Sequence, residues 1–247
     1  MPSYTASAAR EAAGLVLEAV QQGGTLPPFP PSCAPKTVAQ GRRVAALVAE
    51  GIAVPIVGLR LAPAAGLGLE AAGPVLEPRL LRSPAVVPTL AGARRAVTVA
   101  VLAQLAKPLP ARDRAYGPRD LVRRIASLHA AIDLAETRFT LGPPDLPAHL
   151  ADLSGLGLIL FGRPARAGWQ DRVRHPLVVE ATAGGERIWR GEVDLSAALG
   201  RGAEACRSAG GLPAGAVMVV AGLSPPLPDA PVEIRLRGLG AAARGGS

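Results

Sequence analysis

The chain has 247 residues, 49% of them hydrophobic, and a formal charge of +8 with a pI near 10.8. It can bury a full core, and its charge would favour nucleic acid as a partner only if the basic residues clustered. Only two lysines occur, Lys36 and Lys107, the arginines are scattered singly or in pairs, and aromatic residues make up 3%. We therefore do not expect nucleic-acid binding.

The two cysteines, Cys33 and Cys206, lie far apart without a C-x-x-C motif or a companion histidine. This pattern argues against a zinc site or a disulfide framework and favours a reducing, cytoplasmic location. The first residues lack a basic start followed by an apolar run, and no apolar stretch reaches the roughly 20 residues of a membrane helix. We therefore expect no signal peptide and no membrane association.

Two helices are expected first, at residues 7–22 and 37–50, where small and apolar side chains recur at helical spacing. The first ends at Gly23 and Gly24. The proline-rich stretch at 26–31 cannot continue a helix, because each proline removes an amide donor and restricts the preceding residue. We assign residues 1–52 to an N-terminal helical region.

Beyond Gly51, short apolar runs separated by glycine and proline predict strands. Further helices are expected at 119–128, opened by Gly117 and Pro118, and at 196–208. We assign 53–240 to a single domain and 241–247 to a disordered tail. The strands are expected at 54–59, 97–105, 157–161, 177–181, 217–220 and 232–236.

One segment, IASLHAAIDLAETRF at 125–139, resembles the "VHPALEVVDSR" stretch of a known family. That family is the 2-keto-4-pentenoate hydratase and 4-oxalocrotonate decarboxylase branch of the fumarylacetoacetate hydrolase superfamily. The resemblance implies an α/β, β-rich fold, a mixed β roll or sandwich with N-terminal helices packed on it, and a homo-oligomer. Other fragments follow the same family in order, at 24–29, 54–59, 70–78, 109–120, 151–155, 211–224 and 237–240.

In that branch three carboxylates hold Mg²⁺ or Mn²⁺, which binds a 2-keto acid or its enol. The resemblance places the three positions on Thr98, Ala100 and Asp133, and the lysine of the family's "GWKIGL" on Ile56. Only Asp133 offers the oxygen ligand that such a cation needs. Because no glutamate occurs from residue 78 to 132, a shifted alignment cannot restore the pair. We therefore expect no metal cofactor.

The polar residues that remain at family positions form the candidate site. Functionally, an arginine would bind the substrate carboxylate in forked geometry while a carboxylate or histidine transfers a proton. The alternative is an ion pair at a helix-to-strand corner, with His129 capping a helix end. We expect His149 and His175 in surface loops and Cys206 buried. The catalytic candidates are His129, Asp133, Glu136 and Arg138, and the substrate-binding candidates are Asp152, Ser154 and Ser224.

Two classes of function stay open. The first is a divergent hydratase-like enzyme, with carbon–oxygen lyase or decarboxylase-type chemistry on a small 2-oxo acid or enol without the usual metal. The second is a catalytically inactive pseudoenzyme that serves as a scaffold or as the partner subunit of an active enzyme. Neither a phosphate-binding loop nor a G-x-S-x-G motif occurs, which excludes the common nucleotide-binding and serine-hydrolase patterns.

Overall fold

The computed structural model describes residues 4–64, 66–87, 94–239 and 241–246. Its helices are α1 (Ala6–Gln22), α2 (Val38–Ile52), α3 (Pro118–Val122), α4 (Leu146–Ala151), α5 (Trp169–Arg172) and α6 (Leu195–Ser208), with 3-10 turns η1 (Glu77–Arg79) and η2 (Leu153–Gly155). Its strands are β1 (Ile56–Ala64), β2 (Leu69–Leu76), β3 (Leu80–Arg82), β4 (Ala85–Val86), β5 (Arg94–Leu105), β6 (Leu109–Pro110), β7 (Ile125–Thr137), β8 (Leu158–Pro164), β9 (Leu177–Ala183), β10 (Glu186–Val193), β11 (Gly211–Leu212), β12 (Val217–Val220), β13 (Val232–Leu236) and β14 (Ala241–Gly246).

The long helices begin and end where local chemistry favours it. The Thr5 hydroxyl accepts a hydrogen bond from the backbone of Ala8 at the start of α1, and Thr37 does the same for Gln40 at the start of α2. Gly23, at φ 65°, ends α1 in the left-handed conformation that glycine adopts without strain. The predicted helices at 7–22, 37–50 and 196–208 are confirmed as α1, α2 and α6.

Two larger sheets and one short pair of strands make up the β structure. The seven-stranded sheet has the order β2-β1-β12-β5-β7-β8-β3, and the five-stranded sheet has the order β10-β9-β13-β14-β4. Strand β1 runs parallel to β12 and β3 parallel to β8, while the other neighbours in the larger sheet are antiparallel. The fold is therefore α/β, rich in strands and mixed, as the sequence predicts.

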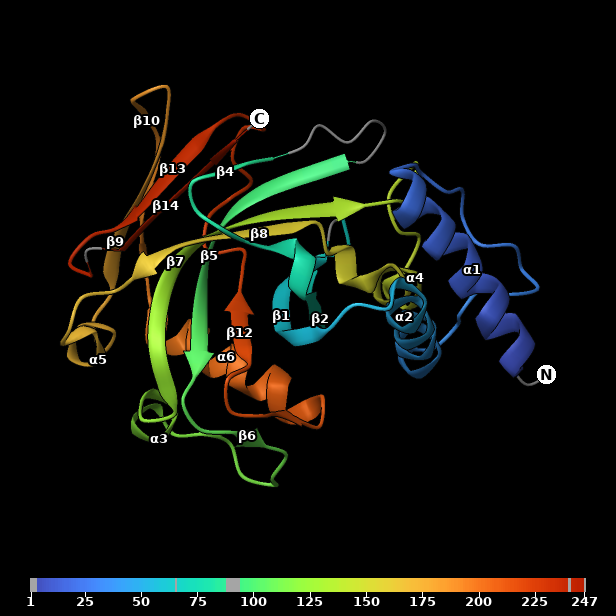
Figure 1. Cartoon of the computed structure of the whole chain (residues 1–247), viewed down its shortest axis with the longest axis horizontal. Helices are drawn as coiled ribbons and strands as arrows, with labels where there is room; N and C mark the ends of the chain where they lie inside the picture. The colour runs from blue at the N-terminus through green and yellow to red at the C-terminus, as the bar shows by residue number, and fades with distance from the viewer. Residues whose placement is uncertain (1–3, 65, 88–93, 240, 247) are drawn as a thin grey trace.

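The seven-stranded sheet lies between two layers (Figure 1). One face packs against the N-terminal helices, with Ala100, Leu102 and Ala131 in a shared apolar cluster with Val16 and Val48. The opposite face packs against the five-stranded sheet and α6 in the other large cluster. The helix-facing side of the larger sheet carries the candidate site. Among the described residues, no helix is long and apolar enough to cross a membrane.

The predicted helix at 119–128 is wrong in its second half, because α3 ends at Val122 and β7 begins at Ile125. Strand β7 pairs with β5 along its whole length, and most of its residues on both faces are buried. The helical spacing of Leu121, Val122, Ile125 and Leu128 continues across the boundary between α3 and β7, which is why the sequence predicts one helix there.

The predicted disordered tail is also wrong for 241–246, which form β14 between β13 and β4. Small residues allow this close packing, since a side chain on Gly162 would collide with the backbone of Ala242. Residue 247 of the predicted tail and residue 240 of the family-like fragment at 237–240 lie outside the described residues.

Candidate functional site

The three family metal positions lie together on the helix-facing side of the sheet. Thr98 on β5 is directly opposite Asp133 on β7, and Ala100 is opposite Ala131. The Thr98 hydroxyl accepts a hydrogen bond from the backbone of Gly222 at 3.1 Å. In the part of the chain that the structure describes, no group of three or more His, Cys, Asp or Glu side chains is arranged so that it could hold a metal ion. With one carboxylate and no other hard anionic ligand, these positions do not fit a divalent cation.

An arginine engages the one carboxylate that remains. The Arg60 guanidinium on β1 donates from Nε to Oδ1 of Asp133 at 2.6 Å and from Nη2 to Oδ2 at 2.7 Å. Its Nη1 donates to the Ser154 carbonyl oxygen at 2.9 Å. Only 1% of the Arg60 side chain and 2% of the Asp133 side chain are exposed. Both carboxylate oxygens are thus held by a buried, fork-shaped ion pair.

Sequence reasoning missed Arg60. The family lysine was placed on Ile56, which is 58% exposed and lies at the start of β1. A signal was present: Gly58 and Arg60 have the same spacing as the glycine and lysine of "GWKIGL", once arginine is accepted in place of lysine. The structure places the Arg60 guanidinium against Asp133, the residue that the resemblance aligns with a metal-binding carboxylate of the family.

Two more ion pairs lie nearby: Arg138–Asp152 is buried and Arg95–Glu136 is partly buried. Arg138 donates to Asp152 from Nη1 at 2.7 Å and from its backbone N–H at 3.0 Å. Burial raises the pKa of the Asp152 carboxyl, and the Arg138 guanidinium opposes this shift. Glu136 accepts a hydrogen bond from Arg95 Nε at 3.2 Å. Arg138, predicted to bind a substrate carboxylate, therefore contacts a carboxylate of the chain itself.

His129 and Ser224 lie apart from these pairs. His129 is within β7, so the expectation that it caps a helix end is wrong. Its Nδ1 is 2.9 Å from the Gly162 carbonyl oxygen and its Nε2 is 2.8 Å from the Ser127 hydroxyl. Burial lowers its pKa. Ser224 accepts from the backbone of Val99 at 3.0 Å. The structure thus gives both residues internal partners, and their catalytic and substrate-binding roles stay predictions.

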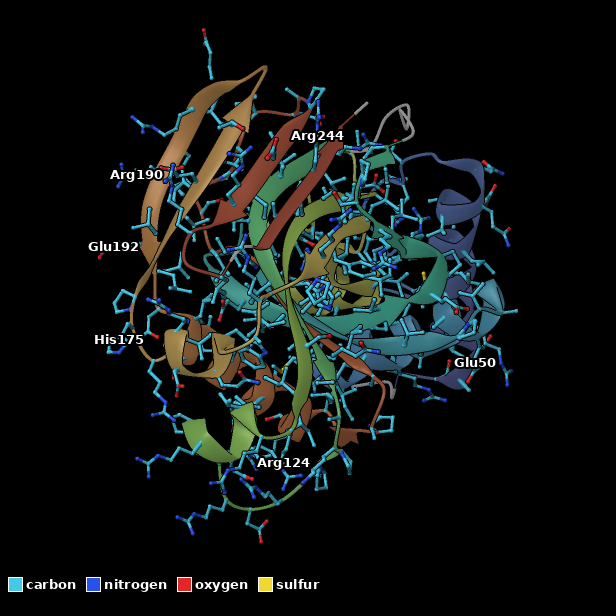
Figure 2. All side chains as sticks on the ribbon, turned by 60° about the vertical axis from the view of Figure 1, so that its left-hand side comes forward. Glu50, Arg124, His175, Arg190, Glu192 and Arg244 are labelled. Atoms are coloured by element: carbon cyan, nitrogen blue, oxygen red, sulfur yellow. The ribbon has the colours of Figure 1, made fainter. Side chains whose placement is uncertain are left out.

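His149 was predicted at the surface, and this is wrong. It lies on α4, is 2% exposed, and lines a cavity of about 380 Å³ between the ends of β5 and β7 and the α4–η2 segment. We call this space the His149 cavity. Burial and the nearby Arg60 charge lower the His149 pKa to about 4. Further lining residues are Arg95, Glu136, Thr137, Ser154 and Gly155. His175, in contrast, points outward from its loop (Figure 2).

The turn beside the cavity has an unusual backbone. Leu153 and Ser154 have positive φ angles of 52° and 55°, a region that side-chain-bearing residues seldom adopt. Gly155 follows at 66°, and a side chain there would approach the His149 ring to 3.1 Å. The Ser154 hydroxyl donates to the carbonyl oxygen of Ala72 at 3.0 Å. Such strain persists only where surrounding contacts hold it, and it often accompanies binding sites.

The architecture resembles the fold of solved enzymes that include a fumarylacetoacetate hydrolase and a 4-oxalocrotonate decarboxylase. Neither a family model nor a curated protein matches the sequence. The chain is similar to 4-oxalocrotonate decarboxylase from Pseudomonas putida G7, solved with magnesium and adipate, at a TM-score of 0.79, 17% identity and coverage of 100% of this chain and 99% of that one. The same decarboxylase was also solved with calcium and acetate, again at a TM-score of 0.79.

Other solved structures share a smaller part of the chain. A 5-carboxymethyl-2-hydroxymuconate delta-isomerase from Mycobacterium smegmatis covers 78% of each chain at 13% identity and a TM-score of 0.52. A fumarylacetoacetate hydrolase from Exiguobacterium antarcticum covers 78% of this chain and 75% of that one, at 15% identity and a TM-score of 0.51. At these sequence identities, the structural similarity establishes the fold alone.

Proposed function

We propose that the chain binds a small 2-oxo acid or its enol in the His149 cavity without a carboxylate-bound metal, for chemistry of the hydro-lyase or decarboxylase type. The observation that carries this proposal is the cavity of about 380 Å³ beside the buried Arg60–Asp133 pair. A partly open cavity of this size, lined by both polar and apolar groups, suits a small organic ligand. The full-length similarity to a decarboxylase solved with adipate, a small dicarboxylic acid, supports this ligand class.

The cavity wall supplies groups suited to an organic acid. Arg95 lines it, carries a permanent positive charge, and can present N–H groups to a carboxylate in fixed geometry. Arg60 adds a second permanent charge close to His149. In this proposal these guanidinium groups supply the positive charge that a divalent cation would otherwise give to an acid or enolate.

Calorimetric titration in chelator tests the proposal, with adipate and 2-oxoadipate as ligands. We expect both acids to bind the wild type. The double variant Arg95→Gln/Glu136→Gln should bind them about tenfold or more weakly, because it removes the charge-assisted hydrogen bond between Arg95 and the ligand carboxylate. The double change avoids a buried carboxylate without its partner. Arg187→Gln, on the exposed part of β10, is the matched control. Absence of binding to the wild type, or binding only with added Mg²⁺, would refute the proposal.

A second candidate function is that of a catalytically inactive scaffold or partner subunit. The observation that favours it is that Asp133 and Asp152, the buried aspartates of the site, are each engaged by an arginine. A carboxylate whose oxygens are already engaged by an arginine of the chain is less available to contact a substrate. Ultraviolet absorbance of 2-hydroxypenta-2,4-dienoate, followed with Mg²⁺ and with chelator, separates the two. Ligand binding without turnover would favour the scaffold.

A further inference from the structure

The His149 cavity gathers polar atoms that have no partner. Among the described residues, the buried side-chain atoms without a hydrogen bond are Oγ1 of Thr137 and both ring nitrogens of His149. Both residues line the same cavity. Buried polar groups in proteins are nearly always bonded, because an unmade hydrogen bond leaves the cost of desolvation uncompensated. Two residues with such atoms in the wall of one cavity indicate side chains whose hydrogen bonds a ligand can complete.

The chemistry of these atoms restricts the ligand. His149 is neutral near pH 7, because burial and Arg60 hold its pKa at about 4. A neutral imidazole has one donor nitrogen and one acceptor nitrogen, and the Thr137 hydroxyl can also donate and accept. A carbonyl or carboxylate oxygen can only accept, so it cannot satisfy the acceptor nitrogen of His149. A ligand hydroxyl can donate to that nitrogen and accept from the threonine.

We propose that His149 and Thr137 form a hydroxyl-binding pair, so that the cavity selects the enol form of a 2-oxo acid, or the matching 2-hydroxy acid, over the keto form. This inference rests on the proposed function and deepens it by naming the form of the substrate that the site recognises. Arg95 and Glu136, which are hydrogen-bonded to each other, line the same cavity. Of the two, Arg95 carries the positive charge that would attract the carboxylate of the ligand. The selectivity thus comes from two neutral side chains.

Calorimetry with a matched series of six-carbon diacids tests the pair. Adipate has no substituent at C2, 2-oxoadipate has a carbonyl there, and each enantiomer of 2-hydroxyadipate has a hydroxyl. In chelator near neutral pH we expect the wild type to bind one enantiomer of 2-hydroxyadipate about tenfold more tightly than 2-oxoadipate, the factor that one net hydrogen bond supplies. Thr137→Val and His149→Phe should bring this ratio close to one while adipate still binds.

The controls separate binding from folding. Thr137→Val keeps the side-chain shape, so it remains informative if His149→Phe fails to fold. His149→Gln restores a donor and an acceptor and should recover part of the preference, while His175→Phe, on the exposed loop, should leave it unchanged. Equal affinity of the wild type for the hydroxy and oxo acids, or a preference that survives both Thr137→Val and His149→Phe, would overturn the inference alone. Failure of all three diacids to bind would refute the proposed function and this inference with it.

Discussion

Acidification should destabilise the fold in part through His149. Its folded pKa of about 4 lies below the ordinary value of 6.5, so the unfolded chain binds more protons between these two pH values. Stability therefore falls as the pH drops from 6.5 towards 4, and the full penalty is present below the folded pKa. The physical cause is that a protonated ring would be buried, 2% exposed, close to the Arg60 guanidinium.

The size of the effect follows from the two pKa values. Between pH 7.5 and 5.5, His149 alone should lower the free energy of unfolding by about 1.3 kcal/mol, and by about 2.5 kcal/mol if the pH reaches 4.5. Urea unfolding followed by circular dichroism measures the free energy at each pH. His149→Gln should lose less stability on acidification than the wild type, by these amounts. His129 also has a pKa lowered by burial, but it is present in both proteins and cancels in the comparison.

His175→Gln, at an exposed loop position, is the matched control for the replacement of a histidine by glutamine. If the wild type and His149→Gln lost the same free energy between pH 7.5 and 5.5, the reasoning about the buried ring would be refuted. The same result would also remove the neutral, orphaned imidazole on which the hydroxyl-binding pair depends.

Three further predictions concern the ion pair, metals and the cysteines. Arg60→Met or Asp133→Leu alone should destabilise the protein by about 3–5 kcal/mol in urea unfolding, whereas the double variant should recover most of the loss, since only the single changes leave a buried charge unpaired. The melting temperature should agree within about 1 °C between buffer with Mg²⁺ and buffer with chelator, and a larger rise with Mg²⁺ would reveal a metal site. Burial raises the Cys206 thiol pKa to about 12 and also raises that of buried Cys33, so mass spectrometry should find both unlabelled by iodoacetamide until urea unfolds the chain.

Helical spacing was enough to predict α1 and α2, because each has a buried apolar stripe that is visible in sequence. Their threonine caps act within a few residues, and the prediction did not use them. The segment at 125–128 failed because Leu121, Val122, Ile125 and Leu128 recur at helical spacing across the boundary between α3 and β7. Its true state is set by pairing with β5, which is a tertiary contact.

The site was harder to predict than the fold. Arg60 and Asp133 are 73 residues apart, and no local pattern indicates that their side chains meet. His149 follows Pro147, which suggested a loop, yet proline is well tolerated in a first helical turn and Asp145 caps α4 through its side chain. That cap was readable from the sequence. The burial of His149 against the cavity was not, because it depends on how α4 packs on the sheet.

The parallel pairing of β1 with β12 has a consequence for biosynthesis. Gly58 aligns with Val217, so about 160 residues must be made before β1 gains this neighbour. Within the sheet β12 also separates β1 from β5 and β7, the strands that carry Thr98 and Asp133. Pairings over such long separations form slowly because loop closure must precede them. Arg60 therefore reaches Asp133 only after β12 has been made, and a nascent chain released before that point would carry the N-terminal helices and the paired strands β5 and β7 without the site.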